Sequence, residues 1–504
     1  QAGSYLDDVL IGAPGPEARS MLQVADLEGS RSAKVKINWA KTVHINLRGD
    51  TTHCDPRVPP EQRLSRGAKY LGIPCGLPDY VSGALVEMVK AYSPLLDRLP
   101  WLEDATMEQD LLRLCAHPRY THAIRAQPPS TTLAAARLHD QGIREHALRL
   151  LALRPGDPGN TLHHTTEHQL SLPTARKGGL GFPTHERIAP GAYQGSWESC
   201  GVLVSTHLPR LADIDDTTTP CIAEYADCRY TNYCIRCGND GSNPLPRRLF
   251  EAQYPLQLSA SDIDKGLQKT LATESNKAVA QERDEHLASL QPRQHRIRQQ
   301  TRTRSLQGYG ALAFLHCASL PGHMLACILR FLMGMPLPGL ETGRHYCECG
   351  VRMDPLGHHA LCCSNRRNPN VPADQRIGQS KVWARHNLVR DKVMELLKGL
   401  GCQHVLKEQA VFDDDGQRAD ITFMHPDGSG RTIALDVSIT HPGGQWPAAL
   451  HASTDLKGAA DTEKEKHDTY DPTTPHNVVF YPFVLETYGA WGAEAEAFLR
   501  PLLR

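Results

Sequence analysis

The stretch "GQRADITFMHPDGSGRTIALDVSITHP" (residues 416–442) decides the fold of the C-terminal part of the chain. Two apolar, β-branched runs flank the segment "DGSG", and Asp-Gly between such runs is a strong signal for a β-hairpin. Asp420 lies at the start of the first run, and Asp436 lies in the middle of the second. A carboxylate inside an apolar strand is costly unless it is paired or binds a metal. The pattern therefore predicts a hairpin that brings two carboxylates together.

The sequence around this hairpin predicts an α/β domain over residues 374–504. The preceding "SKVWARHNLVRDKVMELLKGLG" (380–401) has the pattern of an amphipathic helix with glycine at its end. A strand, "HVLKEQAVF", follows this helix and carries Glu408, a candidate third carboxylate. After the hairpin, "FYPFVLETYGAWG" (480–492) predicts a last strand and a turn.

Length and composition describe an ordinary globular chain. Its 504 residues predict roughly three domains. The net charge of −1 means that any surface for nucleic acid must come from local basic patches. No apolar run reaches the roughly 18 residues of a membrane span, and no secretory signal is visible. Fifteen cysteines in this context predict an intracellular, reducing environment and metal ligation rather than disulfides.

The chain changes character several times before this domain. Residues 1–76 alternate short apolar runs with turns, which predicts strands and loops. A helical pattern occupies about 80–153, and residues 205–250 are polar and turn-rich. A long helix is expected from about 261 to 290.

A second group of candidate ligands lies in "CECGVRMDPLGHHALCC" (347–363). Thiolates and imidazoles at this density are typical of a tetrahedral zinc site, and the alternative is a buried cysteine cluster. The candidate ligands are Cys347, Cys349, one of His358 and His359, and one of Cys362 and Cys363. For a further set, Cys221, Cys228, Cys234 and Cys237, a metal site and an unligated loop both remain open.

The chain begins with "QAGSYLDDVLIGAP", in which Asp7 and Asp8 are adjacent carboxylates at the tip of a predicted hairpin. Alone, this motif does not favour a metal site over an ordinary turn. It is followed by "VKINWAKT" (35–42) and "KYLGIPCG" (69–76), and in this order the three segments resemble motifs C, D and E of the reverse transcriptase palm. The resemblance implies that Asp7 binds catalytic metal with Asp8 beside it. It also implies that the polymerase part is incomplete in this chain, because motif A is not found.

Further segments are similar to non-LTR retrotransposon proteins, which nick DNA and reverse-transcribe their RNA from the exposed 3′ hydroxyl. "LSLPTARKGGLGFP" (170–183) resembles the segment after their thumb, and "ILRFLMGMPLPG" (328–339) resembles the helix before their zinc knuckle. The resemblance implies a multidomain α/β chain with the following parts: a palm remnant at 1–76, a helical thumb and connector at 77–200, a linker region at 201–340, a zinc knuckle at 341–366 and a restriction-like endonuclease at 374–504.

The same resemblance implies the site chemistry. The knuckle would bind Zn²⁺ through Cys347, Cys349, His358 and Cys363, with His359 and Cys362 as alternates. In the endonuclease, Asp420 and Asp436 would hold Mg²⁺ or Mn²⁺. The implied partners are a DNA target and the element's RNA, with no membrane and no small-molecule cofactor beyond metals. The implied location is the nucleus.

One departure from the nuclease motif concerns its lysine. Position 438 is serine where the motif has lysine, and in the retrotransposon enzymes a later helix commonly supplies this residue, near a tyrosine. "DTEKEKHDTY" (461–470) offers Lys466 four residues before Tyr470, with Lys464 as the fallback. The alternative is a solvated helix face. If the site is inactive, the chain would be a non-catalytic relic that binds nucleic acid.

A basic run, "PRQHRIRQQTRTR" (292–304), contains no acidic residue. It is a candidate for phosphate contact, and a solvated helix face or linker is the alternative. Its five arginines are Arg293, Arg296, Arg298, Arg302 and Arg304.

Overall fold

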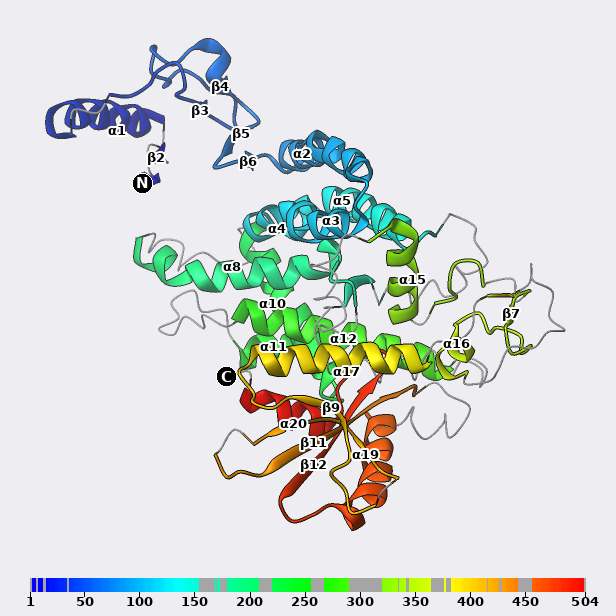
Figure 1. Cartoon of the computed structure of the whole chain (residues 1–504). Coiled ribbons are helices and arrows are strands. Elements are labelled where there is room, and N and C mark those ends of the chain that lie inside the picture. The colour runs from blue at the N-terminus through cyan, green and yellow to red at the C-terminus, as the bar shows by residue number, and fades with distance from the viewer. Residues whose placement is uncertain are drawn as a thin grey trace.

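The computed structural model is a mixed α/β structure, with helices through the middle of the chain and a four-stranded sheet near its C-terminal end (Figure 1). None of the described helices is both long and apolar enough to cross a membrane. The described residues are 2–5, 8–11, 15–33, 36–153, 168, 170–172, 179–207, 220–254, 267–289, 320–333, 335–340, 344–363, 376–377, 382–414, 416–425, 428–442 and 456–502.

The N-terminal part contains the predicted hairpin together with an unexpected helix. Strands β1 (Ala2–Tyr5) and β2 (Asp8–Ile11) pair antiparallel, with Tyr5 opposite Asp8. Helix α1 (Gly15–Glu28) then lies where strands were predicted. A second hairpin, residues 67–76, lies directly before the helical region. The remaining strands of this part are β3 (His44–Ile45), β4 (Arg63–Leu64), β5 (Gly67–Tyr70) and β6 (Ile73–Gly76).

The predicted helical region begins directly after β6. Proline at the first turn of α2 and of α5 suits the helix start, because its fixed φ is helical and its missing N–H would be unpaired there. Asp104 caps α3 by accepting from the backbone N–H groups of Thr106 and Met107, each at 3.0 Å. The helices are α2 (Pro78–Arg98), α3 (Ala105–Leu111), α4 (Thr121–Ala126), α5 (Pro129–Leu150) and α8 (His185–His207).

Residues 201–340 are more helical than the sequence suggested. A 20-residue helix lies in the stretch predicted to be turn-rich, because its Tyr225 and Cys228 pack against Tyr193 of α8 in a small apolar core. Arg330 of α15 donates to the carbonyls of Leu151 and Ala152, each at 2.6 Å, and so satisfies orphan acceptors at the end of α5. The helices are α10 (Pro220–Asn239), α11 (Arg247–Gln253), α12 (Leu267–Ser289) and α15 (Gly322–Met333).

Two glycines of the "GGLG" segment (178–181) occupy positions that other residues would strain. A Cβ on Gly179 would lie 2.0 Å from the carbonyl oxygen of Leu172, so only glycine permits this close backbone contact. Gly181 has a φ of +81°, which disfavours other residues. This turn brings Phe182 back to donate its N–H to Leu170 at 2.8 Å.

The C-terminal domain has the element order that its sequence predicts. Helix α17 ends in a Schellman motif, since Cys402 donates to Leu397 and Gly401, with φ +81°, donates to Lys398. The sheet order is β12-β11-β10-β9, with β11 and β12 parallel and the other pairs antiparallel. The elements are α17 (Val382–Gly399), β9 (Leu406–Gln409), β10 (Ala419–Met424), β11 (Thr432–Thr440), α19 (Lys457–Tyr470), β12 (Val478–Glu486) and α20 (Ala493–Leu502).

Strand β11 places its alternate side chains on different faces of the sheet. Ile433, Leu435 and Val437 belong to the main core, which contains residues of α17 and α20. Asp436 lies on the opposite face, where its carboxylate meets side chains of α19. The two-residue period of the strand therefore fixes which helix the buried carboxylate faces.

A buried polar cluster holds the helical region together. The rings of His117 and His139 lie 4.6 and 4.8 Å from that of His185, centroid to centroid. His185 Nδ1 lies 2.8 Å from Asp140 Oδ1. Burial, and then the proximity of His185, lowers the pKa of His117 and of His139 to about 4. Folding therefore keeps these two imidazoles neutral.

This cluster predicts that the helical region loses stability in acid. Above pH about 6.5 both imidazoles are neutral in the folded and unfolded chains, so their contribution is flat. Between pH 6.5 and about 4 the unfolded chain binds protons that the folded chain does not. Each histidine should then cost on the order of 1.4 kcal/mol per pH unit. Thermal unfolding by circular dichroism should show this fall, and a His117→Gln/His139→Gln variant should show a shallower one. Equal slopes in both proteins would contradict the assignment.

Candidate functional site

The hairpin of β10 and β11 brings the two predicted carboxylates together. Ile421 pairs with Leu435 in this ladder, so extending the register by one residue places Asp420 opposite Asp436. Asp420 Oδ2 also accepts from the backbone N–H of Val437 at 2.7 Å. The two acids thus lie on adjacent strands at one end of the hairpin.

Asp436 is only 6% exposed, and three side chains contact its carboxylate. Lys466 Nζ lies 3.0 Å from Oδ2, and Ser438 Oγ donates to the same oxygen at 3.1 Å. The Tyr470 hydroxyl donates to Oδ1 at 3.0 Å. Burial, and then the negative charge of Asp436, raises the pKa of Tyr470, so this hydroxyl remains a donor. The structure thus brings Lys466 and Tyr470 to the carboxylate, the two residues that the sequence singled out.

Helix α19 is held in place by a second set of polar contacts. His467 lies next to Lys466 in the chain, and its ring nitrogens lie 3.0 Å from Asp471 and 2.8 Å from Glu494 of α20. Burial lowers the pKa of His467, but the hydrogen bonds to these two acids outweigh it, and the pKa is raised overall. Lys464 is exposed on the same helix. Its exposed position makes it a natural control for Lys466.

Asp420 has a partner on α17 that the sequence analysis missed. His386 Nε2 lies 3.2 Å from Asp420 Oδ1. The hydrogen bond to Asp420 raises the pKa of His386, although burial opposes this effect. No local sequence signal links the two residues, because the contact joins a helix to a strand 34 positions later.

A cavity of about 430 Å³ opens over these residues. Arg418 lines it as well and is exposed, two positions before Asp420 and therefore on the same side of the chain. Basic groups thus surround the two carboxylates. The lining residues are Val382, His386, Arg418, Asp420, Asp436, Val437, Ser438, Ile439, Thr440, Thr462, Lys466 and Tyr470.

Glu408, the candidate third carboxylate, lies outside this cavity lining. Its side chain instead pairs with the buried Arg390 of α17, with Oε1 at 2.6 Å from the guanidinium. Glu408 has a φ of +51°, which turns the strand at this point. The prediction that it joins Asp420 and Asp436 is therefore corrected. Its charge balances a buried arginine.

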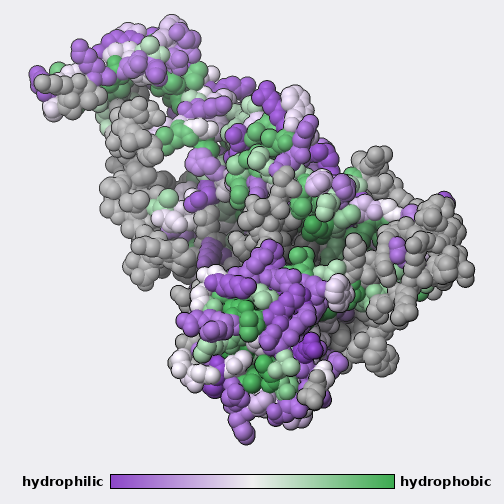
Figure 2. Space-filling model, viewed as in Figure 1, coloured by the Kyte–Doolittle hydropathy of each residue, from purple (hydrophilic) through white to green (hydrophobic). Residues whose placement is uncertain are grey.

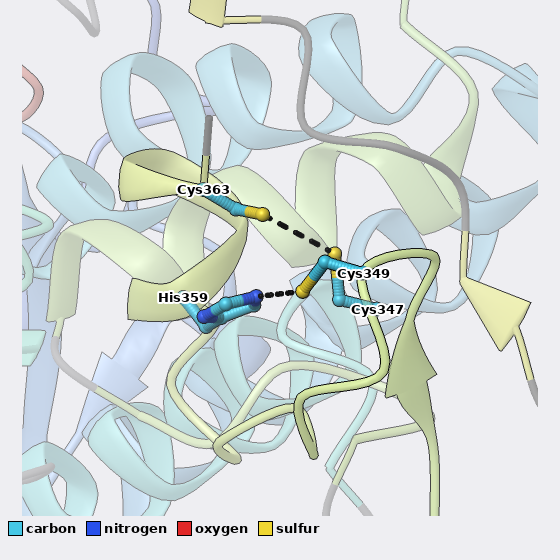
Figure 3. Close-up of side chains that lie close together, drawn as sticks. All are labelled: Cys347, Cys349, His359 and Cys363. Atoms are coloured by element: carbon cyan, nitrogen blue, oxygen red, sulfur yellow. Dashed lines mark hydrogen bonds between the residues drawn. The ribbon is translucent and has the colours of Figure 1, made fainter. Parts of the chain in front are cut away.

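The Cys/His cluster forms a compact group of four ligands: Cys347, Cys349, His359 and Cys363 (Figure 3). Their ligand atoms all lie within 4.8 Å of one another. The Cys347 and Cys363 sulfurs are 3.7 Å apart, and Cys349 Sγ lies 3.2 Å from His359 Nε2. A tetrahedral Zn²⁺ with Zn–S bonds of about 2.3 Å places two sulfurs about 3.8 Å apart. The arrangement could therefore bind zinc.

Strand β7 (Tyr346–Cys347) with the turn after it, and helix α16 (His358–Cys362) with its C-cap residue, supply the four side chains of the cluster. Asp354 fixes the start of α16, because its carboxylate accepts from the backbone N–H of His358 at 3.1 Å and of His359 at 2.9 Å. Burial disfavours a thiolate at Cys349, but hydrogen bonds from Val351 and from neighbouring thiols lower its pKa overall. A lowered pKa suits a metal-binding thiolate.

The preference for His358 as the imidazole ligand is corrected. His359 takes this role in the cluster, whereas His358 is buried and its Nδ1 lies 2.6 Å from Nε2 of His441. His441 follows β11 directly and also contacts Thr487 Oγ1 at 2.6 Å. Cys362, the other alternate, is exposed, and Cys363 is the cysteine that belongs to the cluster. His358, through its contact with His441, therefore joins the cluster region to the sheet domain.

The structure adds little about the other three predicted sites: the cysteines of 221–237, the Asp7–Asp8 pair and the arginines of 292–304. Cys221, Cys228, Cys234 and Cys237 all lie along α10, and within the described part of the chain the only metal-sized group of three or more Cys, His, Asp or Glu is the one above. Asp7 and the arginines of 292–304 lie outside the described residues, and for Asp8 only the backbone of β2 is described.

Comparisons with known proteins give no family. No family model matches the chain, and no curated protein matches it.

The metal cluster makes a direct prediction. The purified chain should contain one zinc per molecule, because four soft or borderline ligands converge. His359→Ala and Cys349→Ser should each lose most of this zinc, measured by inductively coupled plasma mass spectrometry. His358→Gln is the matched control and should retain it. Zinc that depends on His358 and not on His359 would contradict the ligand set.

Proposed function

We propose that residues 374–504 form a divalent-metal-dependent nuclease that nicks DNA. The observation that carries the proposal is the pair Asp420 and Asp436 in one cavity, with Lys466 3.0 Å from the buried carboxylate. Mg²⁺ is often bound in proteins by one or two carboxylates together with substrate phosphates. Two acids therefore suffice, and a third ligand such as Glu408 is not needed.

The carboxylates, the lysine and the arginine of the cavity would have different roles in cleavage. Mg²⁺ or Mn²⁺ held by the two carboxylates would activate a water and stabilise charge on the phosphate. Lys466 is placed to orient that water or to stabilise charge on a phosphate oxygen. The exposed Arg418 is placed at the cavity to bind a phosphate by its fork of donors. As the water oxygen bonds to phosphorus the P–O3′ bond breaks, and the products carry a 5′ phosphate and a 3′ hydroxyl.

The wider setting that we propose is a non-LTR retrotransposon protein. The 3′ hydroxyl that such a nick leaves is the primer end that target-primed reverse transcription requires. The proposal assigns the β1–β2 hairpin, with Asp7 and Asp8, to a reverse transcriptase palm. It assigns the cluster of Cys347, Cys349, His359 and Cys363 to a zinc knuckle before the nuclease. The element RNA and a DNA target are the proposed partners.

The alternative is a nucleic-acid-binding protein without catalysis. It is favoured by Ser438, which stands where a nuclease motif has lysine and donates to Asp436 at 3.1 Å. Together with Lys466 and Tyr470, this hydroxyl satisfies the buried carboxylate without any metal. Under this alternative the chain binds DNA in a salt-sensitive way but does not nick it with any divalent metal.

The first test of the nuclease compares a carboxylate of the cavity, Asp436, with a carboxylate outside it, Glu408. Asp436→Asn should reduce Mg²⁺- or Mn²⁺-dependent nicking of supercoiled plasmid by at least about 100-fold, since it removes a metal ligand. DNA binding should persist, because its affinity comes largely from phosphate contacts elsewhere. Glu408→Gln is the control and should retain nicking. Nicking that survives both Asp420→Asn and Asp436→Asn would exclude this site.

The second test concerns the lysine. Lys466→Ala should lower the nicking rate by about 100-fold or more, in the range of a lost charge-stabilising group, and should change the Kd for DNA by less than about 3-fold. Lys464→Ala, on the exposed face of the same helix, should change the rate little. Single-turnover nicking rates and filter binding measure the two effects. Equal losses in the two variants would show that only the general charge of α19 matters.

A further inference from the structure

Trp383 is a large aromatic side chain that the fold leaves 77% exposed. It lies in the first turn of α17, directly after Val382 and three positions before His386. Both of these neighbours line the cavity of Asp420 and Asp436. Residues three apart on a helix are surface neighbours, with Cβ atoms roughly 5–6 Å apart. Trp383 therefore lies at the rim of the cavity, one side chain away from its wall.

The helix geometry explains why this position is not packed. Arg390, two turns further along the same side of α17, is buried and pairs with Glu408 of β9. The sheet thus covers this side of the helix at Arg390 but leaves Trp383 exposed. Leu388, another exposed apolar residue of α17, is about 140° around the helix from Trp383. The two do not form one apolar face for a protein partner.

The surroundings of Trp383 are polar and partly basic. The solvent-facing side of the C-terminal domain is largely hydrophilic around α17 (Figure 2). Arg418 and Lys466 contribute cationic groups to the cavity itself. An aromatic ring next to cationic groups fits a nucleic-acid strand, because the bases stack on the ring while the cations bind phosphates. This ligand chemistry matches the polar rim better than an apolar protein surface does.

We propose that Trp383 is a stacking platform for an unpaired DNA base next to the phosphate in the cavity. The inference rests on the proposed nuclease function and deepens it, because it makes DNA with an unpaired base near the nick the preferred substrate class. The stacking is tolerant of base identity, since every base presents a π-face.

The test uses a duplex that carries one bulged 2-aminopurine, whose fluorescence falls when it stacks. The full chain with Asp436→Asn serves as the background, so that the DNA stays intact in Mg²⁺. Binding should quench the fluorescence, and Trp383→Ala should remove the quenching while Trp383→Phe retains most of it. The Kd for bulged DNA should rise about 5- to 100-fold in Trp383→Ala. The Kd for fully paired duplex should change less than about 2-fold.

A matched control exists in Trp101, which is 78% exposed in the helical region. Trp101→Ala should leave quenching and both affinities unchanged. Quenching that persists in Trp383→Ala, or that falls equally in Trp101→Ala, would overturn the proposal. Nicking of plain plasmid by the wild-type chain reports separately on the nuclease. Trp383-dependent quenching without any nicking would support the stacking site and contradict the nuclease.

Discussion

A single buried charge, that of Asp436, constrains the C-terminal domain. An ionised carboxylate inside a central strand is tolerated only when the surrounding structure supplies hydrogen bonds or opposite charge. Helix α19 supplies both, through Lys466 and Tyr470. The crossover from β11 to the parallel strand β12 therefore carries this helix across the face of the sheet that bears Asp436. The position of α19 and the burial of the Asp436 carboxylate therefore depend on each other.

The same end of the sheet is where other parts of the chain converge. His441, directly after β11, contacts His358, which lies beside His359 of the Cys/His cluster. Arg385 of α17 donates to the carbonyl of Leu361 at 3.1 Å, and Phe331 of α15 stacks on Tyr488 with centroids 4.8 Å apart. The Cys/His cluster is thus docked against the elements that form the cavity. Metal binding in the cluster would order residues that contact both α17 and the end of β11.

The sequence predicts the carboxylate site well because its signals are local. A turn motif between two apolar runs fixes the register of the hairpin, and the register places Asp420 opposite Asp436. Lys466 and Tyr470 are one helical turn apart, so they face the same carboxylate. The prediction of Glu408 was wrong because pairing with Arg390 depends on how α17 packs, which is a long-range property.

Other features could not be read from spacing alone. His358 and His359 point about 100° apart on their helix, and the cap at Asp354 decides which of them faces the cysteines. His386 meets Asp420 only through tertiary packing. Helix α10 was missed because its apolar positions are mostly Cys, Tyr and Ala rather than long aliphatic residues, and aromatic packing against α8 stabilises it.

Iron-mediated cleavage tests most directly the proposal that Asp420 and Asp436 together bind a divalent metal. Fe²⁺ bound in place of Mg²⁺ generates hydroxyl radicals with ascorbate and peroxide. These radicals cut the protein backbone near the metal. Cuts are expected in β10 and β11 close to residues 420 and 436, and excess Mg²⁺ should suppress these cuts while Asp436→Asn should remove them. Cuts confined to other parts of the chain, or cuts at these strands that persist in Asp436→Asn, would contradict the proposal.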